Sequence, residues 1–171
     1  MWYTKRRWKA AVLALDGAML VLALALSYLD VLLPLPVPGF KLGLANLVVM
    51  TVFVYIGIAD AAVVSLLRVT VSAVLFGTPI TFWFSFGGAV CAFLLLLLLR
   101  GIRFRGFGWT GVSTLCAAAH NLGQALAGII FFGVAAIVSY LPWLLLMAVV
   151  GGFITGTVMC ALCRRLFPGA K

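Results

Sequence analysis

The sequence predicts an all-α integral membrane protein with about six transmembrane helices. Hydrophobic residues occupy 66% of its 171 positions and charged residues only 9%, which lies far outside the composition of soluble globular domains. Long apolar runs alternate with short breaks, and each run approaches the ~20 residues that cross a hydrocarbon core. Six such runs leave no room for a soluble domain, so we expect a single transmembrane domain over residues 1–171.

Breaks in the hydrophobic pattern divide the chain into spans that cover residues 10–29, 42–58, 60–76, 81–99, 109–132 and 140–163. The first follows a basic start, but its apolar run is longer than the core of a signal peptide, so we expect a retained helix. Three prolines between positions 34 and 38 favour an extended segment before the second span. The second and third spans meet at a tight turn near Gly57.

The last three spans are bounded by turn-forming, basic and aromatic residues. Gly77-Thr-Pro79 interrupts the apolar pattern before the fourth span, because proline lacks an N–H donor and restricts the residue before it. Arg100, Arg103 and Arg105 mark the loop between the fourth and fifth spans. Tyr140 begins the sixth span, where an amphipathic ring suits the membrane interface.

The net charge of +9 arises mainly from three basic clusters at the ends of the predicted spans. Their members are Lys5, Arg6, Arg7 and Lys9; Arg100, Arg103 and Arg105; and Arg164, Arg165 and Lys171. Even numbers of spans separate the clusters, so the positive-inside rule predicts that both termini and the arginine loop are cytoplasmic. The basic residues are not spread over a polar surface, which favours the lipid bilayer over nucleic acid as a partner.

Arg68 lies inside the third span, in an apolar run from Ala61 to Phe76. A charged side chain at the bilayer centre costs about 2.5–3.5 kcal/mol on insertion scales, so it must face a partner helix, water or a ligand. At ~1.5 Å per helical residue, Arg68 lies ~12 Å into its span and His120 lies ~16 Å into the fifth. Both are therefore expected deep within the membrane.

Five polar residues could line one cavity that opens outward, namely Lys41, Asn46, Arg68, His120 and Gln124. Gln124 lies one turn beyond His120 on the same helix face. Two cations, two amides and one imidazole, without a matching carboxylate in the outer half, suit a small anionic or strongly hydrogen-bonding ligand. We therefore predict that these five residues bind a substrate.

Purely structural roles for the same residues stay open. Asp16 lies ~10 Å into the first span by the same count, close to the level of Arg68. An intramembrane Asp16–Arg68 ion pair would satisfy both charges without a ligand. His120 alone could bridge two helices by a hydrogen bond, and Lys41 could extend to the outer headgroups.

The sequence predicts no catalytic, metal or cofactor site. A Walker A sequence is absent, and the single histidine cannot complete a convincing catalytic set. Cys160 and Cys163 have C-x-x-C spacing without evident further ligands, so we expect them to be packing residues.

Four stretches of the chain carry a family resemblance: Pro38-Gly-Phe-Lys-Leu-Gly-Leu-Ala-Asn46, Ser65-Leu-Leu-Arg-Val69, Phe76-Gly-Thr78 and Ala119-His-Asn-Leu-Gly-Gln124. They resemble the bacterial Gx transporter family, which is also labelled heptaprenyl diphosphate synthase component I. The resemblance extends from about Leu26 to Gly156. It implies a protein of the bacterial cytoplasmic membrane with a six-helix bundle similar to the S components of energy-coupling-factor transporters.

The resemblance also implies a docking surface and shows three departures. In the wider transporter group the first helix docks on a scaffold subunit through an Ala-x-x-x-Ala face, a role that Ala14 and Ala18 would carry here. An ATPase-bearing partner would then supply energy. Asp30 stands where a Ser-Tyr-x-Glu pattern would place a longer acid, Ser72-Ala73 replaces a Gly-Ser pair, and Asp16 is an added charge.

The enzyme label of the family does not fit the acids of this chain. Prenyl diphosphate condensation needs clustered carboxylates to hold Mg²⁺, whereas Asp16, Asp30 and Asp60 are at least fourteen positions apart. We therefore expect a non-enzymatic substrate-binding or transport protein for a small anionic or amphiphilic ligand, working with an energy-supplying partner. Two alternatives are a lipid-binding accessory subunit of isoprenoid or quinone metabolism, with a prenylated ligand, and a scaffold subunit of a membrane complex.

Overall fold

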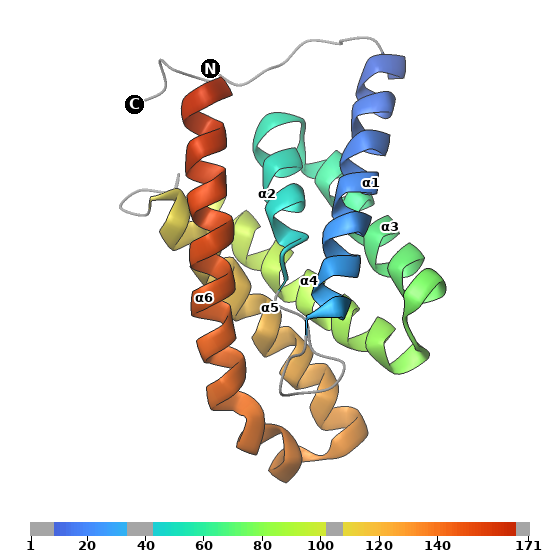
Figure 1. Cartoon of the computed structure of the whole chain (residues 1–171), viewed down its shortest axis with the longest axis vertical. Coiled ribbons are helices and arrows are strands. Elements are labelled where there is room, and N and C mark those ends of the chain that lie inside the picture. The colour runs from blue at the N-terminus through green and yellow to red at the C-terminus, as the bar shows by residue number, and fades with distance from the viewer. Residues whose placement is uncertain (1–8, 34–42, 102–107, 167–171) are drawn as a thin grey trace.

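The computed structural model describes residues 9–33, 43–101 and 108–166, and the regular structure within these ranges is entirely helical (Figure 1). The helices are α1 (Lys9–Leu32), α2 (Asn46–Tyr55), α3 (Ile58–Phe76), α4 (Pro79–Gly101), α5 (Trp109–Phe132) and α6 (Val134–Leu166). Five of them are long and apolar enough to cross a membrane, whereas α2 has only ten residues. The predicted all-helical membrane fold is confirmed, but α2 falls short of a full span.

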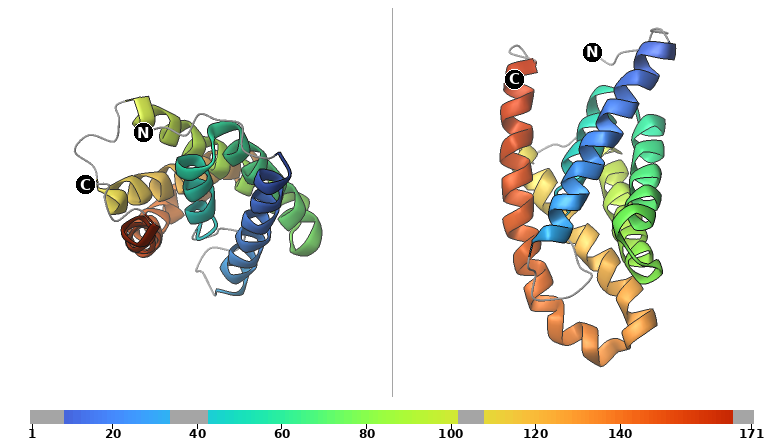
Figure 2. Two further views of the ribbon diagram at one scale, coloured as in Figure 1. Left: turned by 90° about the horizontal axis from the view of Figure 1, so that it is seen from above. Right: turned by 45° about the vertical axis from the view of Figure 1, so that its right-hand side comes forward.

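The short helix α2 lies at the centre of the bundle. It contacts each of the five other described helices, whereas α1 contacts only α2 and α3. The view from above shows α2 between α1 and α6 (Figure 2). Helix α5 makes the most extensive contacts, with α4 and with α6. The bundle is therefore assembled around a helix that is too short to cross it.

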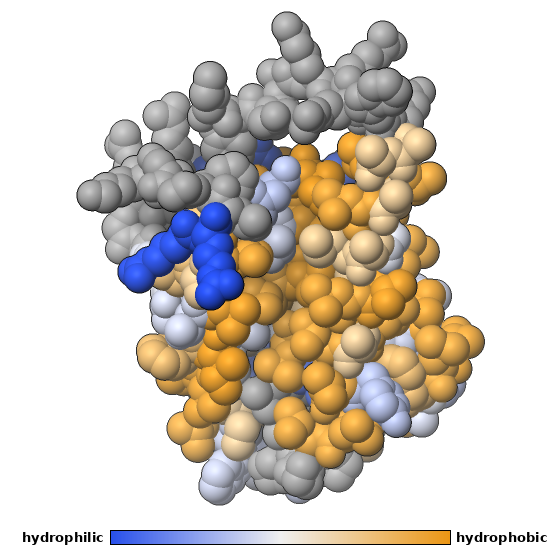
Figure 3. Space-filling model, turned by 45° about the horizontal axis from the view of Figure 1, so that its top comes forward, coloured by the Kyte–Doolittle hydropathy of each residue, from blue (hydrophilic) through white to orange (hydrophobic). Residues whose placement is uncertain are grey.

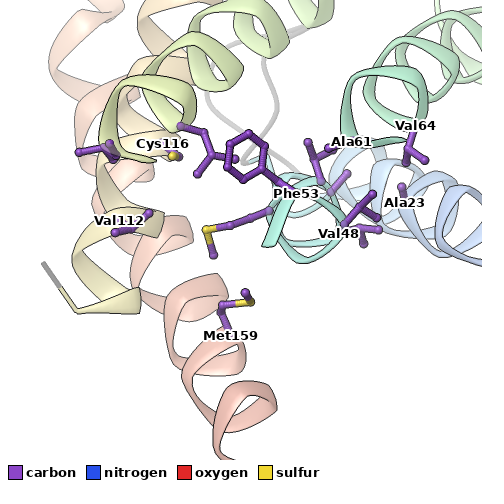
Figure 4. Close-up of a cluster of buried hydrophobic side chains, with 14 residues drawn as sticks. Ala23, Val48, Phe53, Ala61, Val64, Val112, Cys116 and Met159 are labelled. Carbon is purple, nitrogen blue, oxygen red and sulfur yellow. The ribbon is translucent and has the colours of Figure 1, made fainter. Parts of the chain in front are cut away.

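The main hydrophobic core consists of buried side chains of α2 and of the side chains packed around them (Figure 4). All six helices contribute to this core, through Ala23, Val48, Val52, Phe53, Ala61, Val64, Leu96, Val112, Cys116 and Met159 among others. A second, smaller cluster joins α4, α5 and α6 around Phe84 and Leu144. Most of the described face seen in Figure 3 is also hydrophobic, as expected where lipid replaces water around the bundle.

The start of α2 corrects the second predicted span. That span was expected to begin at residue 42, but a turn over Gly43, Leu44 and Ala45 precedes the helix. Gly43 adopts a left-handed φ of 83°, which residues with a Cβ atom adopt only at a cost. The backbone N–H of Asn46 donates to the Gly43 carbonyl at 2.9 Å. Turn geometry therefore overrides an apolar pattern that would suit a longer helix.

The other breaks follow the sequence more closely. The fifth helix has the predicted bounds, and the sixth begins earlier, at Val134, so Pro142 lies inside it. Thr78 and Thr81 cap the start of α4 reciprocally, since the N–H of Thr78 donates to Thr81 Oγ1 at 2.7 Å and that of Thr81 to Thr78 Oγ1 at 3.3 Å. Pro79 occupies the first helical position, where its missing N–H is not needed.

Glycines allow close approach between α4, α5 and α6. A Cβ atom on Gly87 would lie 2.7 Å from the carbonyl oxygen of Gly123, and one on Gly152 would collide with the backbone of Thr114. Beside the second contact, the hydroxyl groups of Ser113 and Thr155 are hydrogen-bonded at 2.7 Å. Gly87, Gly88 and Gly152 are therefore contact points between these helices.

Candidate functional site

The candidate site surrounds the turn that precedes α2. The ten residues of α2 extend ~15 Å, about half of a ~30 Å hydrocarbon core, so its first residue lies at membrane depth. Figure 1 shows α2 starting about midway along the bundle, between α1 and α6. Non-helical backbone at this depth is tolerated only where protein or a cavity satisfies its polar groups. The surroundings of residues 43–46 therefore determine what the site can bind.

Arg68 on α3 is the buried cation of the site, with 3% of its surface exposed. Its Nη1 donates a long hydrogen bond, 3.4 Å, to the hydroxyl of Ser27 on α1, and the favourable charge that acts on it comes from Asp30. Nε and Nη2 are buried and have no hydrogen-bond partner among the described residues. These two atoms form the side-on edge of the guanidinium, which binds carboxylates and phosphates through two parallel bonds.

Asp30 links this cation to the turn. Its carboxylate is 2% exposed, and its Oδ2 accepts a 3.0 Å hydrogen bond from the backbone N–H of Leu44. The carboxylate therefore lies near the positive end of the α2 dipole, where an anion is favoured. The expectation that the outer half lacks a matching carboxylate is wrong, because α1 continues past residue 29 and brings Asp30 into the site.

His120 on α5 lies on the other side of the turn. A Cβ atom on Gly43 would lie 3.3 Å from His120 Cδ2, and one on Gly88 of α4 would lie 2.7 Å from His120 Nδ1. The amide Nε2 of Gln124 lies 2.9 Å from His120 Nε2. An amide nitrogen can only donate, so in this pairing the ring nitrogen of His120 accepts. Two glycines thus make room for an oriented imidazole.

A cavity of about 20 Å³ lies beside the turn. Its polar lining comes from Asn46 and Ser65, and the rest is mainly apolar, with Cys116 on one wall. This volume holds a single water molecule, far less than the ~300 Å³ of the smallest usual ligand pockets. Within this cavity, a ligand larger than water would require the lining groups to move.

Comparison with known proteins adds one finding to this geometry. The family model described as heptaprenyl diphosphate synthase component I matches residues 19–162. The chain belongs to this family. No curated protein and no solved structure matches it in the corresponding comparisons. All the residues described around the turn lie within the part of the chain that matches the synthase component I family.

The structure brings together three of the five residues predicted for this member of the synthase component I family. Asn46 and His120 lie against Gly43 of the turn, and Gln124 is hydrogen-bonded to His120. Arg68 is connected to the turn only indirectly, because the charge that acts on it comes from Asp30, which accepts from Leu44. Lys41 lies outside the described residues. Of the five, only Asn46 lines the small cavity described above.

Asp16 and Arg68 are not brought together. Asp60 is the acid whose charge acts on Asp16, and Ser27, the hydrogen-bond partner of Arg68, lies eleven residues further along α1, or ~16 Å. The pairing predicted from residue depths holds only if the first and third spans start at the same depth in the membrane. Asp16 instead lies opposite the first turn of α3, so α1 extends roughly 8 Å beyond that helix.

Ser27 and Asp30 were not predicted as site residues, and Ala14 and Ala18 lie apart from the site. A sequence signal for the first pair existed, since their three-residue spacing puts both on one face of α1. Ala14 and Ala18 are exposed on the same helix and precede the part of the chain that matches the family. Their docking role stays a prediction.

Proposed function

We propose that this protein binds a small anionic or amphiphilic ligand in the membrane and takes part in its transport. The observation that supports this proposal is the side-on edge of Arg68, which is buried and unpartnered among the described residues. An exposed arginine finds water for every donor, but a buried one requires acceptors for its N–H groups. A carboxylate, phosphate or diphosphate supplies two acceptors in the geometry that this edge prefers.

The neighbouring groups suit the same chemistry. In several transporter folds a helix that is interrupted within the membrane directs its N-terminus at the anionic group of the substrate, and α2 begins at comparable depth. Asn46 and Gln124 would orient the ligand, and His120 would add a proton-sensitive hydrogen bond. Lys41 would contribute a second positive charge.

Transport requires an energy source outside this chain. We propose a scaffold subunit and an ATPase-bearing partner, reached through Ala14 and Ala18, by analogy with the S components that the sequence resembles. In this arrangement both termini are cytoplasmic and the membrane is the bacterial cytoplasmic membrane, as the clusters of basic residues favour.

A second candidate function is favoured by the description of the family. A component of a heptaprenyl diphosphate synthase could bind a prenyl diphosphate and present it to a separate catalytic subunit. The diphosphate would then occupy Arg68 and the prenyl chain would follow the apolar helices. We propose that such a role is non-catalytic, because the three aspartates are widely separated along the chain.

The experiment that tests anion binding uses the purified full chain in phosphatidylcholine nanodiscs, with inorganic diphosphate as the probe in isothermal titration calorimetry. Arg68→Gln should weaken binding by roughly 100-fold, since a bidentate charged pair is worth about 2–3 kcal/mol. Arg164→Gln, which removes an exposed arginine near the end of α6, is the matched control and should bind normally. Equal binding by the two variants would refute the proposal.

Native mass spectrometry of the purified protein separates the two candidate functions. A co-purifying prenyl lipid, with no ATPase-bearing partner, would favour the accessory role. A polar anion, together with co-purifying scaffold and ATPase subunits, would favour transport.

A further inference from the structure

The small cavity beside the start of α2 combines polar and apolar walls. Its volume is about 20 Å³, and its lining comes from α2, α3, α4 and α5. Most of the lining residues are buried, namely Val49, Met50, Ser65, Ala89, Ala92, Leu96 and Cys116. Entirely apolar cavities in proteins stay dry, whereas a polar cavity of this size holds a water molecule. The polar groups of the lining therefore decide what occupies it.

Asn46 supplies the first polar group of the cavity. It is the first residue of α2, and its Nδ2 is buried without a hydrogen-bond partner among the described residues. A buried amide donor without an acceptor costs about 1–3 kcal/mol, and in lipid no bulk water is available to accept its hydrogen bonds. The side chain of Asn46 therefore requires an acceptor within its reach.

Ser65 on α3 and Cys116 on α5 supply two further polar groups. Both residues line the cavity and are 6% exposed. A hydroxyl donates and accepts hydrogen bonds, and a thiol does both weakly. Together with the Asn46 amide, these groups offer a water molecule about three partners, which lies within the usual number for a buried water.

We infer that this cavity is a binding site for an ordered water molecule, which accepts a hydrogen bond from the Asn46 amide and is held by the hydroxyl of Ser65. Ser65 lies three residues before Arg68, on the same face of α3. The water therefore connects the polar face of α3, which carries Arg68, with the start of α2. This inference does not depend on the proposed function, because the water site is complete without a ligand on Arg68.

Hydroxyl-radical footprinting by X-ray radiolysis tests this inference on the purified full chain in phosphatidylcholine nanodiscs. Radiolysis of a bound water generates hydroxyl radicals in place, so a buried side chain beside that water becomes oxidised. Met50 on α2 is 3% exposed and lines the cavity, whereas Met159 on α6 is 0% exposed and lies outside the lining. The two thioethers have the same chemistry, so oxidation of Met50 should be several-fold faster than that of Met159.

Variants of the lining identify the groups that hold the water. Asn46→Leu and Ser65→Ala each remove a strong hydrogen-bond partner, so the water should be lost and oxidation of Met50 should fall to the rate of Met159. Ser85→Ala is the matched control, because it removes the hydroxyl of another buried serine, 3% exposed, that lies outside the lining. This control should leave the oxidation of Met50 unchanged.

Two results would overturn the inference. One is an equal oxidation rate for Met50 and Met159 in the wild-type protein. The other is oxidation of Met50 at the wild-type rate in both Asn46→Leu and Ser65→Ala. If Asn46→Leu loosens the fold, oxidation of Met159 rises together with that of Met50, and Ser65→Ala alone then decides. A fall of Met50 oxidation to the rate of Met159 in that variant supports the water site, and no fall overturns it.

Discussion

Replacing Gly123 by alanine provides a sharp test of the helix packing that supports the site. A Cβ atom at this position would lie 2.7 Å from the carbonyl carbon of Gly87 and 2.9 Å from the Cβ of Cys91. An ordinary contact begins at 3.4 Å, so relieving the contact with the carbonyl carbon alone would move α4 away from α5 by about 0.7 Å, and the carbonyl oxygen of Gly87 is closer still. The first obstacle is backbone, so no change of side-chain rotamer relieves it.

The expected loss of stability is large for one methyl group. Overpacking of a close-packed interior costs about 1–3 kcal/mol, and α4–α5 is one of the two most extensive contacts between the described helices. We therefore expect Gly123→Ala to lower the free energy of unfolding by about 2–3 kcal/mol. Circular dichroism during SDS-driven unfolding in mixed micelles measures this difference. Anion binding should weaken too, because the movement separates Gly88 from His120.

Gly17→Ala is the matched control, since a Cβ atom on Gly17 of α1 meets nothing within 4 Å. Alanine is a better helix former than glycine by up to about 1 kcal/mol, so this variant should be as stable as wild type or slightly more stable. Equal unfolding free energies for Gly123→Ala and Gly17→Ala would show that α4 and α5 do not cross in contact at Gly87.

Three further substitutions test separate features. Gly43→Ala should lower the unfolding free energy by about 1–2 kcal/mol in the same assay, because the left-handed φ of 83° is unfavourable for alanine; an unchanged value would refute that turn geometry. Asn121→Ala should cost about 0.6–1.7 kcal/mol through loss of its 2.7 Å hydrogen bond to the Leu144 carbonyl, and no effect would place Asn121 outside the α5–α6 contact. Ala14→Trp should abolish co-purification with a scaffold subunit, and intact co-purification would remove the docking role.

Hydrophobicity predicted the fold class well because the bilayer imposes it. In lipid, the backbone N–H and C=O groups of a segment must be hydrogen-bonded within the protein. A long apolar run therefore crosses the membrane as a helix, which pairs these groups internally. The bounds of α5 and the break at Gly77-Thr-Pro79 follow directly from the sequence. These signals are local, and no distant residue is needed to interpret them.

Relative helix positions could not be predicted in the same way. Depth counted from each span's own start pairs Asp16 with Arg68, but α1 extends further than α3 and brings Ser27 and Asp30 to Arg68 instead. The offset depends on side-chain packing between helices, to which residues from all of them contribute. The apolar pattern ends the first span at residue 29, one position before Asp30, and therefore does not place Asp30 in the site.

Apolar composition and backbone geometry disagree at the start of α2, and the site is located there. Residues 42–58 are apolar enough for a span, yet Gly43 turns the chain and leaves the N–H of Leu44 to be satisfied by Asp30. A buried acid is expensive in lipid, and it is retained here beside two partners, a backbone donor and a buried cation.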